Sequence, residues 1–465
     1  MRIDKLRLKN FRCFSDIEID LNEKLTVLVA ENGQGKSALM DAIRIALWPF
    51  VSSFDLARSS FTDPGTGIAI SDVRLIRLPD GGMARQLPSE VAMTGDFGSG
   101  ERSTWIRYRE REARATKTKD DGDTSELKKW ATKVQSQIRD GSAPKHELPV
   151  FGYYGTGRLW SQKQLRHNIR GKDDTRDPDF YIRTFAYLNC LDPASSYKHF
   201  KEWFIWAFES LREQQIKKME GRSDTNELHA ARDRIQVVQQ AIDTFLKPIT
   251  GWHTLEYSVS REKSLILNHD EQGTLDAEQL SDGIRSVLAM VGDIAYRCIK
   301  LNPHLGVDAG RKTAGVVMID EVDMHLHPRW QQVVLGQLQE AFPQVQFIVS
   351  THSPQVLTTV ARGFIRVLKT DENGVSVEVP KFSPLAHESG DALAQIMGTN
   401  REPALPLQDN IRAFEQLVRA GEEASTEAQV LRGELEAAGY QFHESDLSTW
   451  RFLAERKKTR SVDRG

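Results

Sequence analysis

The sequence predicts an α/β fold with a mixed β-sheet, a helical insertion in the middle of the chain and a helical C-terminal extension. Three stretches carry this prediction. An apolar run over 27–29 leads into a glycine-containing loop and an apolar helix over 38–47; a second run over 316–319 ends in two carboxylates; a third over 346–349 ends in Ser-Thr-His-Ser-Pro. Continuous aliphatic runs of this length, separated by helical patterns, are typical of buried parallel strands.

The first of these stretches has the strand, loop and helix order of a phosphate-binding loop. Glycines allow backbone N–H groups to turn inward around a phosphate, and the start of the following helix adds its positive end. We expect Lys36 to reach the β- and γ-phosphates of ATP and the Ser37 hydroxyl to bind Mg²⁺. The expected nucleotide-binding residues of the loop are Asn32, Gly33, Gln34, Gly35, Lys36, Ser37 and Ala38.

The loop departs from the usual pattern GxxxxGK[ST] at its first position, where Ala30 replaces glycine. Its small side chain is expected to fit, although the first turn of the loop then has less conformational freedom. The prediction of a phosphate-binding loop therefore depends on the later stretches as well.

Polar side chains close the second and third apolar runs, where Asp320, Glu321 and His352 follow the predicted strands. Because the carboxyl ends of parallel strands meet at one edge of a sheet, these groups are expected beside the loop. We predict that Asp320 binds Mg²⁺ directly or through water, that Glu321 orients and deprotonates the attacking water, and that His352 senses the γ-phosphate. The alternative for the two acids is a solvated strand end.

The stretch Leu-Ser-Asp-Gly over 280–283 opens a predicted helix over 284–300. Ser281 and Gly283 at a helix start form another anion site. Because the first loop already cradles one nucleotide, the simplest arrangement places Ser281 at the γ-phosphate held by a second copy of the chain. Two such half-sites would close two ATP molecules between two heads, in a symmetric homodimer.

Two arginines and one charged segment have two interpretations each. Arg12, in a turn between predicted paired strands over 2–9 and 14–21, is either a phosphate ligand or an exposed turn residue. Arg158 follows a predicted buried strand over 148–154 and is either a γ-phosphate or partner-site candidate or part of an ordinary loop. The mixed-charge segment 107–126 is predicted to be a solvated loop or face, with a DNA-contacting surface as the alternative.

The composition limits the classes of protein that the chain can be. A net charge of −3 over 465 residues provides no global basic field, so any contact with DNA requires a local patch. Cys13, Cys190 and Cys298 are far apart, which argues against a disulfide framework or a cysteine zinc site. Without a signal-peptide core or an apolar run long enough to span a membrane, a cytoplasmic protein is expected.

Residues 193–247 show helical periodicity, with aromatic and aliphatic side chains at three- and four-residue steps. They predict a helical insertion, whose second helix is expected to end at Pro248. An aromatic stripe at helical spacing is more often core than a ligand site.

Four motifs resemble those of the ABC-type ATPase heads of the SMC and RecF-like group. In chain order, they are the phosphate-binding loop (Walker A), LSDG (signature), VVMIDE (Walker B) and STHSP (H-loop). The resemblance implies a P-loop ATPase with ATP and Mg²⁺ as cofactors. In that group the signature is usually LSGG, so Asp282 puts the strength of the contact across the dimer in doubt. The expected domains are a head with an N-terminal lobe over 1–165, a helical insertion over 166–250, a C-terminal lobe over 251–383, and a helical partner-docking module over 384–465.

More narrowly, LSDGIRSVLAMVGDIAYR and IDEVDMHLHPRWQ resemble the PtuA family, the ATPases of Septu anti-phage systems that are also found with some retrons. This resemblance implies a homo-oligomeric defence ATPase whose nucleotide state regulates a PtuB-like HNH nuclease, with DNA contacted through that partner. The alternative is a RecF-like or SMC-like DNA-binding repair ATPase without a nuclease partner. The last 110 or so residues separate the two, because a repair head needs no helical docking module after the H-loop.

Overall fold

The structure is a computed structural model. It describes residues 1–57, 65–98, 100–113, 116–140, 145–159, 178–193, 197–222, 224–261, 263–371, 374–399 and 405–462. The chain forms two compact units, Met1–Ala392 and Leu393–Gly465. The first unit contains the sheets and all the sequence motifs, and the second is helical.

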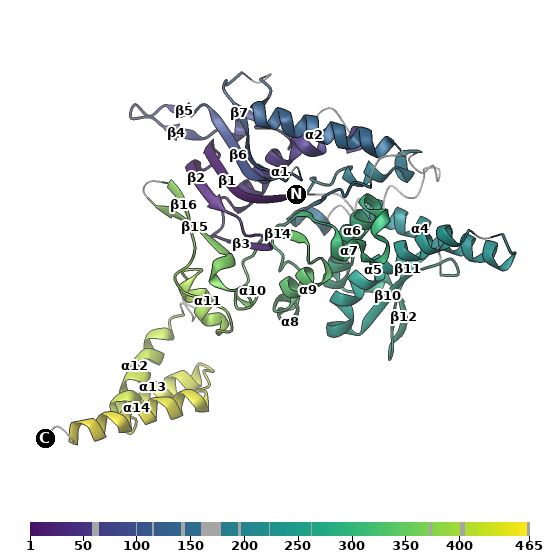
Figure 1. Ribbon diagram of the computed structural model, residues 1–465. Helices are drawn as coiled ribbons and strands as arrows, with labels where there is room; N and C mark the ends of the chain where they lie inside the picture. Colours follow the sequence, from purple (N-terminus) through teal and green to yellow (C-terminus); the bar gives the residue numbers. More distant parts are fainter. Residues whose placement is uncertain are drawn as a thin grey trace. The chain divides into compact units, whose positions relative to one another are not determined.

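The main sheet of the first unit has the strand order β16-β15-β3-β14-β13-β9. Figure 1 labels β16, β15, β3 and β14 of this sheet. Its strands are β3 (Leu25–Val29), β9 (Val150–Tyr154), β13 (Gly315–Ile319), β14 (Val345–Ser350), β15 (Ile365–Asp371) and β16 (Gly374–Glu378). All are parallel except β16, which pairs antiparallel with β15. Every residue of β3, β9, β13 and β14 is buried, as the aliphatic runs predict. The carboxyl ends of β3, β14 and β13 therefore lie side by side.

An antiparallel sheet with the order β2-β1-β6-β7-β8 forms the second layer. Its strands are β1 (Arg2–Phe11), β2 (Phe14–Asp20), β6 (Ser89–Asp96), β7 (Arg102–Arg109) and β8 (Lys119–Asp120), and a separate hairpin joins β4 (Leu75–Arg77) to β5 (Met83–Arg85). β1 and β2 pair with Lys5 opposite Asp20 and Phe11 opposite Phe14, which confirms the predicted pair of strands.

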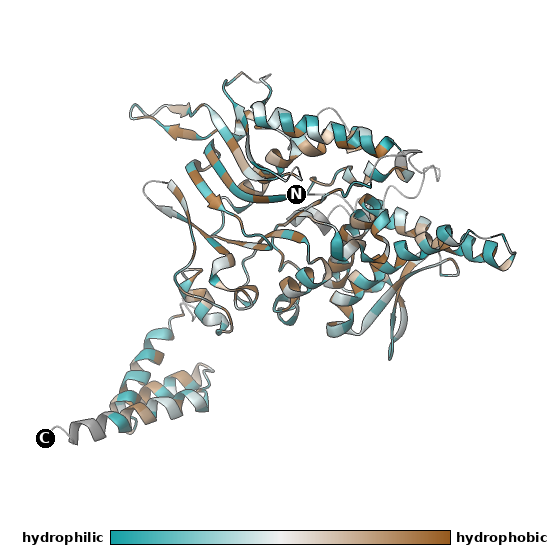
Figure 2. Ribbon diagram, viewed as in Figure 1, coloured by the Kyte–Doolittle hydropathy of each residue, from teal (hydrophilic) through white to brown (hydrophobic). Residues whose placement is uncertain are grey.

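Helix α1 (Lys36–Val51) contacts both sheets. Trp105 of β7 donates a hydrogen bond from its indole Nε1 to the carbonyl oxygen of Ala46, at 2.9 Å. On the other side, the ring of Phe50 lies 5.5 Å from that of Phe151 in β9. Helix α2 (Gly122–Arg139) covers the end of α1, and Figure 2 shows hydrophilic and hydrophobic residues alternating along it, as an amphipathic helix requires.

The helical insertion consists of α4 (Tyr197–Met219) and α5 (Thr225–Thr250), which pack against α6 (Asp282–Leu301). Phe200 and Trp203 are almost completely buried, and the ring of Trp203 lies 5.0 Å from that of Tyr296 in α6. The aromatic stripe therefore belongs to the core. A third sheet joins β10 (Trp252–Ser258), β11 (Ser264–His269) and β12 (Gly273–Asp276), and the short helices are α7 (Ala309–Lys312), α8 (Pro328–Gln331), α9 (Val334–Ala341) and α10 (Pro354–Leu357).

The second unit is a bundle of three helices, α12 (Gln408–Ala420), α13 (Thr426–Ala437) and α14 (Glu444–Val462). A preceding helix, α11 (Ser389–Gln395), spans the boundary between the units. The bundle has a core of its own, made of Phe414, Val418, Ala428, Leu435 and Leu447.

Two sequence-based predictions of local structure are wrong. Helix α5 does not end at Pro248 but continues to Thr250, where Gly251 with φ 77° closes it. A proline in the last turn removes one hydrogen-bond donor, and the packing of α5 against α6 keeps that turn helical. The segment 107–126 is not a solvated loop or face throughout, because Arg107 and Arg109 are buried and α2 begins within it.

Candidate functional site

The loop between β3 and α1 is closed by its own lysine. Lys36 Nζ donates hydrogen bonds to the carbonyl oxygens of Ala30, at 2.7 Å, and Glu31, at 3.2 Å. Helix α1 begins at Lys36, and its N-cap Gly35 offers no side chain to the first backbone N–H groups. These N–H groups, together with the helix dipole, favour an anion at this position.

Glycine is required at two positions of the loop for different reasons. Gly33 and Gly35 have φ values of +83° and +100°, which disfavour any residue with a side chain. A Cβ at Gly35 would also lie 2.6 Å from the ring of Phe14 and 2.7 Å from the Sγ of Cys13. Ala30 does not have a positive φ, so its methyl group is compatible with the loop. This explains why the departure at Ala30 leaves the loop geometry intact.

Asp320 follows β13 and connects the loop to the strand ends. Its Oδ2 accepts a hydrogen bond from Ser37 Oγ at 2.9 Å, and its Oδ1 accepts one from Ser350 Oγ at 2.5 Å. The carboxylate is 7% exposed. Burial lowers the pKa of nearby Lys36, while the charges of Asp320 and Glu321 act in the opposite direction. The structure thus brings together Lys36, Ser37 and Asp320, which the sequence places in two distant motifs.

Glu321 has an unusual backbone conformation. Its φ is +49°, and its N–H donates to Ser350 Oγ at 2.8 Å. A left-handed conformation in a residue with a side chain costs free energy and is concentrated at functional sites. Ser350, at the end of β14, therefore fixes both acids of the Asp-Glu pair. Sequence reasoning missed Ser350; its signal was a hydroxyl at the end of a fully buried strand.

The backbone around His352 is held by hydrogen bonds of the residues before and after it, Thr351 and Ser353. Thr351 Oγ1 donates to Asp323 Oδ1 at 2.5 Å, and Ser353 caps α10 by accepting hydrogen bonds from the N–H groups of Gln355 and Val356. Ser353 Oγ also donates to Gln331 at 2.7 Å. His352 is therefore held in place after β14, and its side chain is partly exposed.

The Leu-Ser-Asp-Gly stretch lies at the start of α6, as predicted. Ser281 is the N-cap, and its Oγ accepts from the N–H of Ile284 at 3.5 Å. A Cβ at Gly283 would lie 2.7 Å from the carbonyl oxygen of His325, so this glycine permits close packing against the turn that follows β13. Asp282 forms an ion pair with Arg285 one turn along the helix.

Arg12 lies in the turn between β1 and β2 and is engaged by two carboxylates. It forms ion pairs with Asp41 of α1, at 2.7 Å, and Asp72, at 2.9 Å. Burial opposes the charge of the guanidinium, but the two carboxylates outweigh it and raise its pKa. The contacts in the structure are therefore structural ones that join the turn to α1. The side chain of Arg158 lies outside the described residues.

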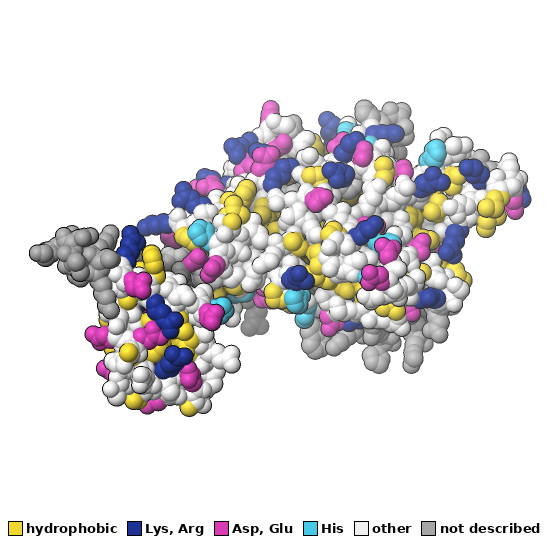
Figure 3. All heavy atoms as spheres, turned by 90° about the horizontal axis from the view of Figure 1, so that it is seen from below, with side chains coloured by type: hydrophobic (Ala, Val, Ile, Leu, Met, Phe, Trp, Pro, Cys, Tyr) yellow, Lys and Arg dark blue, Asp and Glu magenta, His cyan; other side chains and the backbone are white. Residues whose placement is uncertain are grey.

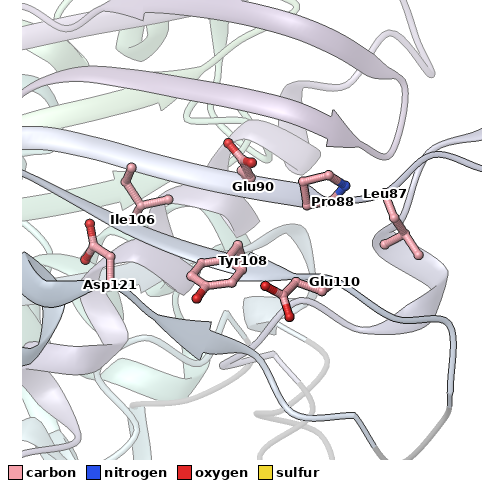
Figure 4. Close-up of a pocket in the computed structure, with 7 residues that line it drawn as sticks. All are labelled: Leu87, Pro88, Glu90, Ile106, Tyr108, Glu110 and Asp121. Carbon is pink, nitrogen blue, oxygen red and sulfur yellow. The ribbon is translucent and has the colours of Figure 1, made fainter.

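A pocket of about 490 Å³ lies elsewhere, on the antiparallel sheet. Figure 4 shows Tyr108 flanked by Asp121 and Glu110, with Glu90 on the neighbouring strand. Three carboxylates at its lining would repel a triphosphate, so this pocket does not suit ATP. The loop beside α1 remains the candidate nucleotide site.

A family model for the AAA domain matches residues 5–248. The chain belongs to the AAA-domain family. A second model, described as an AAA domain, putative AbiEii toxin, Type IV TA system, matches residues 191–358 of this AAA-domain protein. The two matched ranges together contain the loop, the Leu-Ser-Asp-Gly stretch, the Asp-Glu pair and His352.

Several proteins are similar to this AAA-domain protein. The Retron Vc95 probable ATPase of Vibrio cholerae is 26% identical over 467 residues, which cover 91% of this chain and 84% of the relative. Septu protein PtuA of Bacillus mycoides is 40% identical over 95 residues, 20% of this chain and 13% of the relative. The solved SMC head domain from Thermotoga maritima aligns with 82% of this chain and 100% of its own, at 15% identity and a TM-score of 0.43.

The family match and the sequence relatives confirm two predictions. The AAA-domain protein is an ATPase, and it is related to PtuA and to the retron ATPases. In the described part of the chain, no helix has the length and apolar character needed to cross a membrane.

Proposed function

We propose that this ATPase binds ATP with Mg²⁺ at the loop 30–37 and hydrolyses it beside Asp320 and Glu321. The observation that carries the proposal is the 2.9 Å hydrogen bond between Ser37 and Asp320, residues 283 positions apart. A hydroxyl and a carboxylate oxygen are hard ligands that suit Mg²⁺. Bound there, Mg²⁺ would neutralise charge on the β- and γ-phosphates.

Each group of the protein would then have a separate role in binding or hydrolysing ATP. The N–H groups of the loop and of the first turn of α1 bind phosphate oxygens, and Lys36 turns its ammonium group toward the β- and γ-phosphates. Glu321 orients and deprotonates the attacking water, and His352 donates to the γ-phosphate. The strained backbone of Glu321, fixed by Ser350, supports a role that depends on accurate placement.

We further propose that the site is completed by a second copy of the chain. Ser281 at the start of α6 would contact the γ-phosphate held by the partner's loop, as in a symmetric dimer with two shared sites. The close packing of Gly283 on the turn after β13 supports this, because it holds the start of α6 in a fixed position on the head. The ion pair of Asp282 with Arg285 reduces the negative charge that Asp282 would present to a phosphate.

Mixing two inactive variants tests the shared site. Lys36→Ala removes the loop lysine, and Ser281→Arg blocks the start of α6. In a mixed dimer, one site combines an intact Lys36 with an intact Ser281 from the other subunit. An equal mixture is therefore expected to recover about a quarter of wild-type ATPase activity, since half of the dimers are mixed and each has one working site.

The control for this mixture is Ser425→Arg, which removes a comparable N-cap in α13, where Ser425 accepts from the N–H of Ala428 at 3.2 Å. Its activity is expected to stay at the wild-type level. A mixture of the two inactive variants that stays as inactive as its components under conditions of subunit exchange would contradict the shared site.

The biological role that we propose is anti-phage defence, in a complex whose nucleotide state regulates an HNH nuclease that cleaves DNA. Similarity to the Retron Vc95 probable ATPase over 91% of the chain, and to the Septu protein PtuA, supports this role. On the face in Figure 3, basic and acidic side chains are interspersed rather than separated, which favours DNA contact through the partner. ATP binding would favour closed heads and so bias the partner by differential affinity.

The helical bundle of the second unit is proposed to dock this partner. The bundle has a separate hydrophobic core, and the side chains of Val430 and Phe452 remain 54% and 60% exposed. These two exposed apolar side chains are the candidate contact residues that the test below changes.

Removing residues 405–465 is expected to leave ATP hydrolysis within about twofold of wild type, because the bundle core lies wholly inside the deleted part. Co-purification of a co-expressed HNH nuclease is expected to be lost. A second variant, Val430→Ser with Phe452→Ser, should weaken the same capture while keeping the bundle folded. Full nuclease capture by the shortened protein would refute the docking role.

A further inference from the structure

Tyr154, the last residue of β9, forms hydrogen bonds in two directions. Its carbonyl oxygen accepts from the N–H of Asp320 at 2.8 Å, at the end of the adjacent strand β13. Its hydroxyl donates to Asp293 Oδ2 in α6 at 2.7 Å. The side chain is 3% exposed, so water does not compete for these bonds. One residue thus links the proposed metal ligand to the helix that carries Ser281.

The acceptor in α6 is part of a buried charged network. The same Oδ2 of Asp293 accepts from Arg297 Nε at 2.7 Å, and Arg297 also donates to the carbonyl oxygens of Ala186 and Leu188. Asp293 and Arg297 are at most 1% exposed. Burial and the facing carboxylate raise the pKa of Tyr154 well above its ordinary value, so the hydroxyl remains a donor. Hydrogen bonds in such a dry network fix geometry, because an unpaired buried carboxylate is costly.

Helix α6 is also held at its start. Gly283 packs so closely on the turn after β13 that a Cβ would lie 2.7 Å from the carbonyl oxygen of His325. The start and the middle of α6 are therefore both attached to the end of β13, at Gly283 and through Tyr154. The position of α6 relative to Asp320 is therefore fixed at two places rather than one.

We propose that Tyr154 is a positioning residue that ties α6 to Asp320 and so sets where its subunit presents Ser281 to the nucleotide held by the partner. This inference rests on the proposed shared site. Tyr154 touches neither nucleotide nor metal in this scheme. Its contribution is to fix α6 relative to the strand end that carries Asp320.

Tyr154→Phe removes the hydroxyl and keeps the ring and the backbone bond to Asp320. The matched control is Tyr187→Phe, because Tyr187 is equally buried and its hydroxyl donates to the backbone carbonyl oxygen of Pro149 at 2.9 Å, not to a side chain of α6. We expect similar losses of melting temperature for the two variants and unchanged affinity for a fluorescent ATP analogue. The turnover number of Tyr154→Phe is expected to fall about tenfold, while that of Tyr187→Phe stays near wild type. Equal turnover in the two variants would overturn the proposal.

A mixture of Tyr154→Phe with Lys36→Ala shows which half-site the Tyr154 substitution impairs. In a dimer of Tyr154→Phe with Lys36→Ala, the one site with a working loop lysine receives its Ser281 from the subunit with intact Tyr154. Turnover of an equal mixture is expected to rise to about a quarter of wild type. If Tyr154→Phe instead impaired the nucleotide loop of its own subunit, turnover would be about 5% of wild type. The lower value would overturn the inference. Failure of the shared site is distinguishable, because the Lys36→Ala and Ser281→Arg mixture would then also remain inactive.

Discussion

Replacing Lys36 by alanine is expected to abolish measurable ATP binding, with affinity reduced about 100-fold or more. The ammonium group is the one positive side chain proposed to face the β- and γ-phosphates, and a hydrogen bond to a charged group contributes about 1.5–3 kcal/mol, with several such bonds lost together. The variant also removes the bonds that close the loop on the carbonyl oxygens of Ala30 and Glu31. Titration with a fluorescent ATP analogue in the presence of Mg²⁺ measures the loss.

A matched variant distinguishes phosphate binding from loss of a structural bond. Lys24 Nζ also donates to a backbone carbonyl oxygen, that of Pro343 at 2.6 Å, but lies at the start of β3 instead of its end. Lys24→Ala should therefore lose a comparable bond and keep full ATP affinity. If both variants bound ATP equally well, Lys36 would have no role in the nucleotide site.

The second large effect is expected for Glu321→Gln. The substitution preserves the size of the side chain and removes its ability to take a proton, so ATP binding should be retained. The turnover number should fall about 10²–10⁴-fold, the usual contribution of a general base. Single-turnover measurements of phosphate release, with bound nucleotide measured separately, test both parts of this expectation.

Glu340→Gln provides the control for loss of one negative charge, because Glu340 is exposed on α9, away from the strand ends. Its turnover should match wild type. Undiminished phosphate release by Glu321→Gln would assign the base to another group and leave Glu321 with a structural role at most.

Local motifs allowed the sequence to predict the strands and the helix that form the candidate site. The strand before Ala30, the helix from Lys36 and the strands before Asp320 and His352 are all present, because each is specified by a short run of buried residues with a polar end. Their meeting at one edge also followed from the sequence, because parallel strands place their carboxyl ends together.

Features that depend on distant partners could not be predicted in the same way. Arg107 belongs to a segment whose charge pattern indicated solvent, yet its guanidinium donates to the carbonyl oxygens of Ile45 and Thr66, at 2.9 and 2.6 Å. The periodicity of the sequence does not indicate where those carbonyl groups lie in the folded protein. The same holds for Tyr154 and Asp293, which are 139 positions apart and meet only through the packing of α6.

The conformation of the loop has a consequence for genome searches. A pattern that demands glycine at the first position of the loop would pass over this chain, although Ala30 satisfies the backbone there without strain. Of the two loop glycines with positive φ, Gly35 is the more constrained, because a methyl group there would also collide with Cys13 and Phe14. A search template that fixes the second glycine and the lysine, and accepts any small residue six positions before that lysine, would recover ATPases that stricter templates discard.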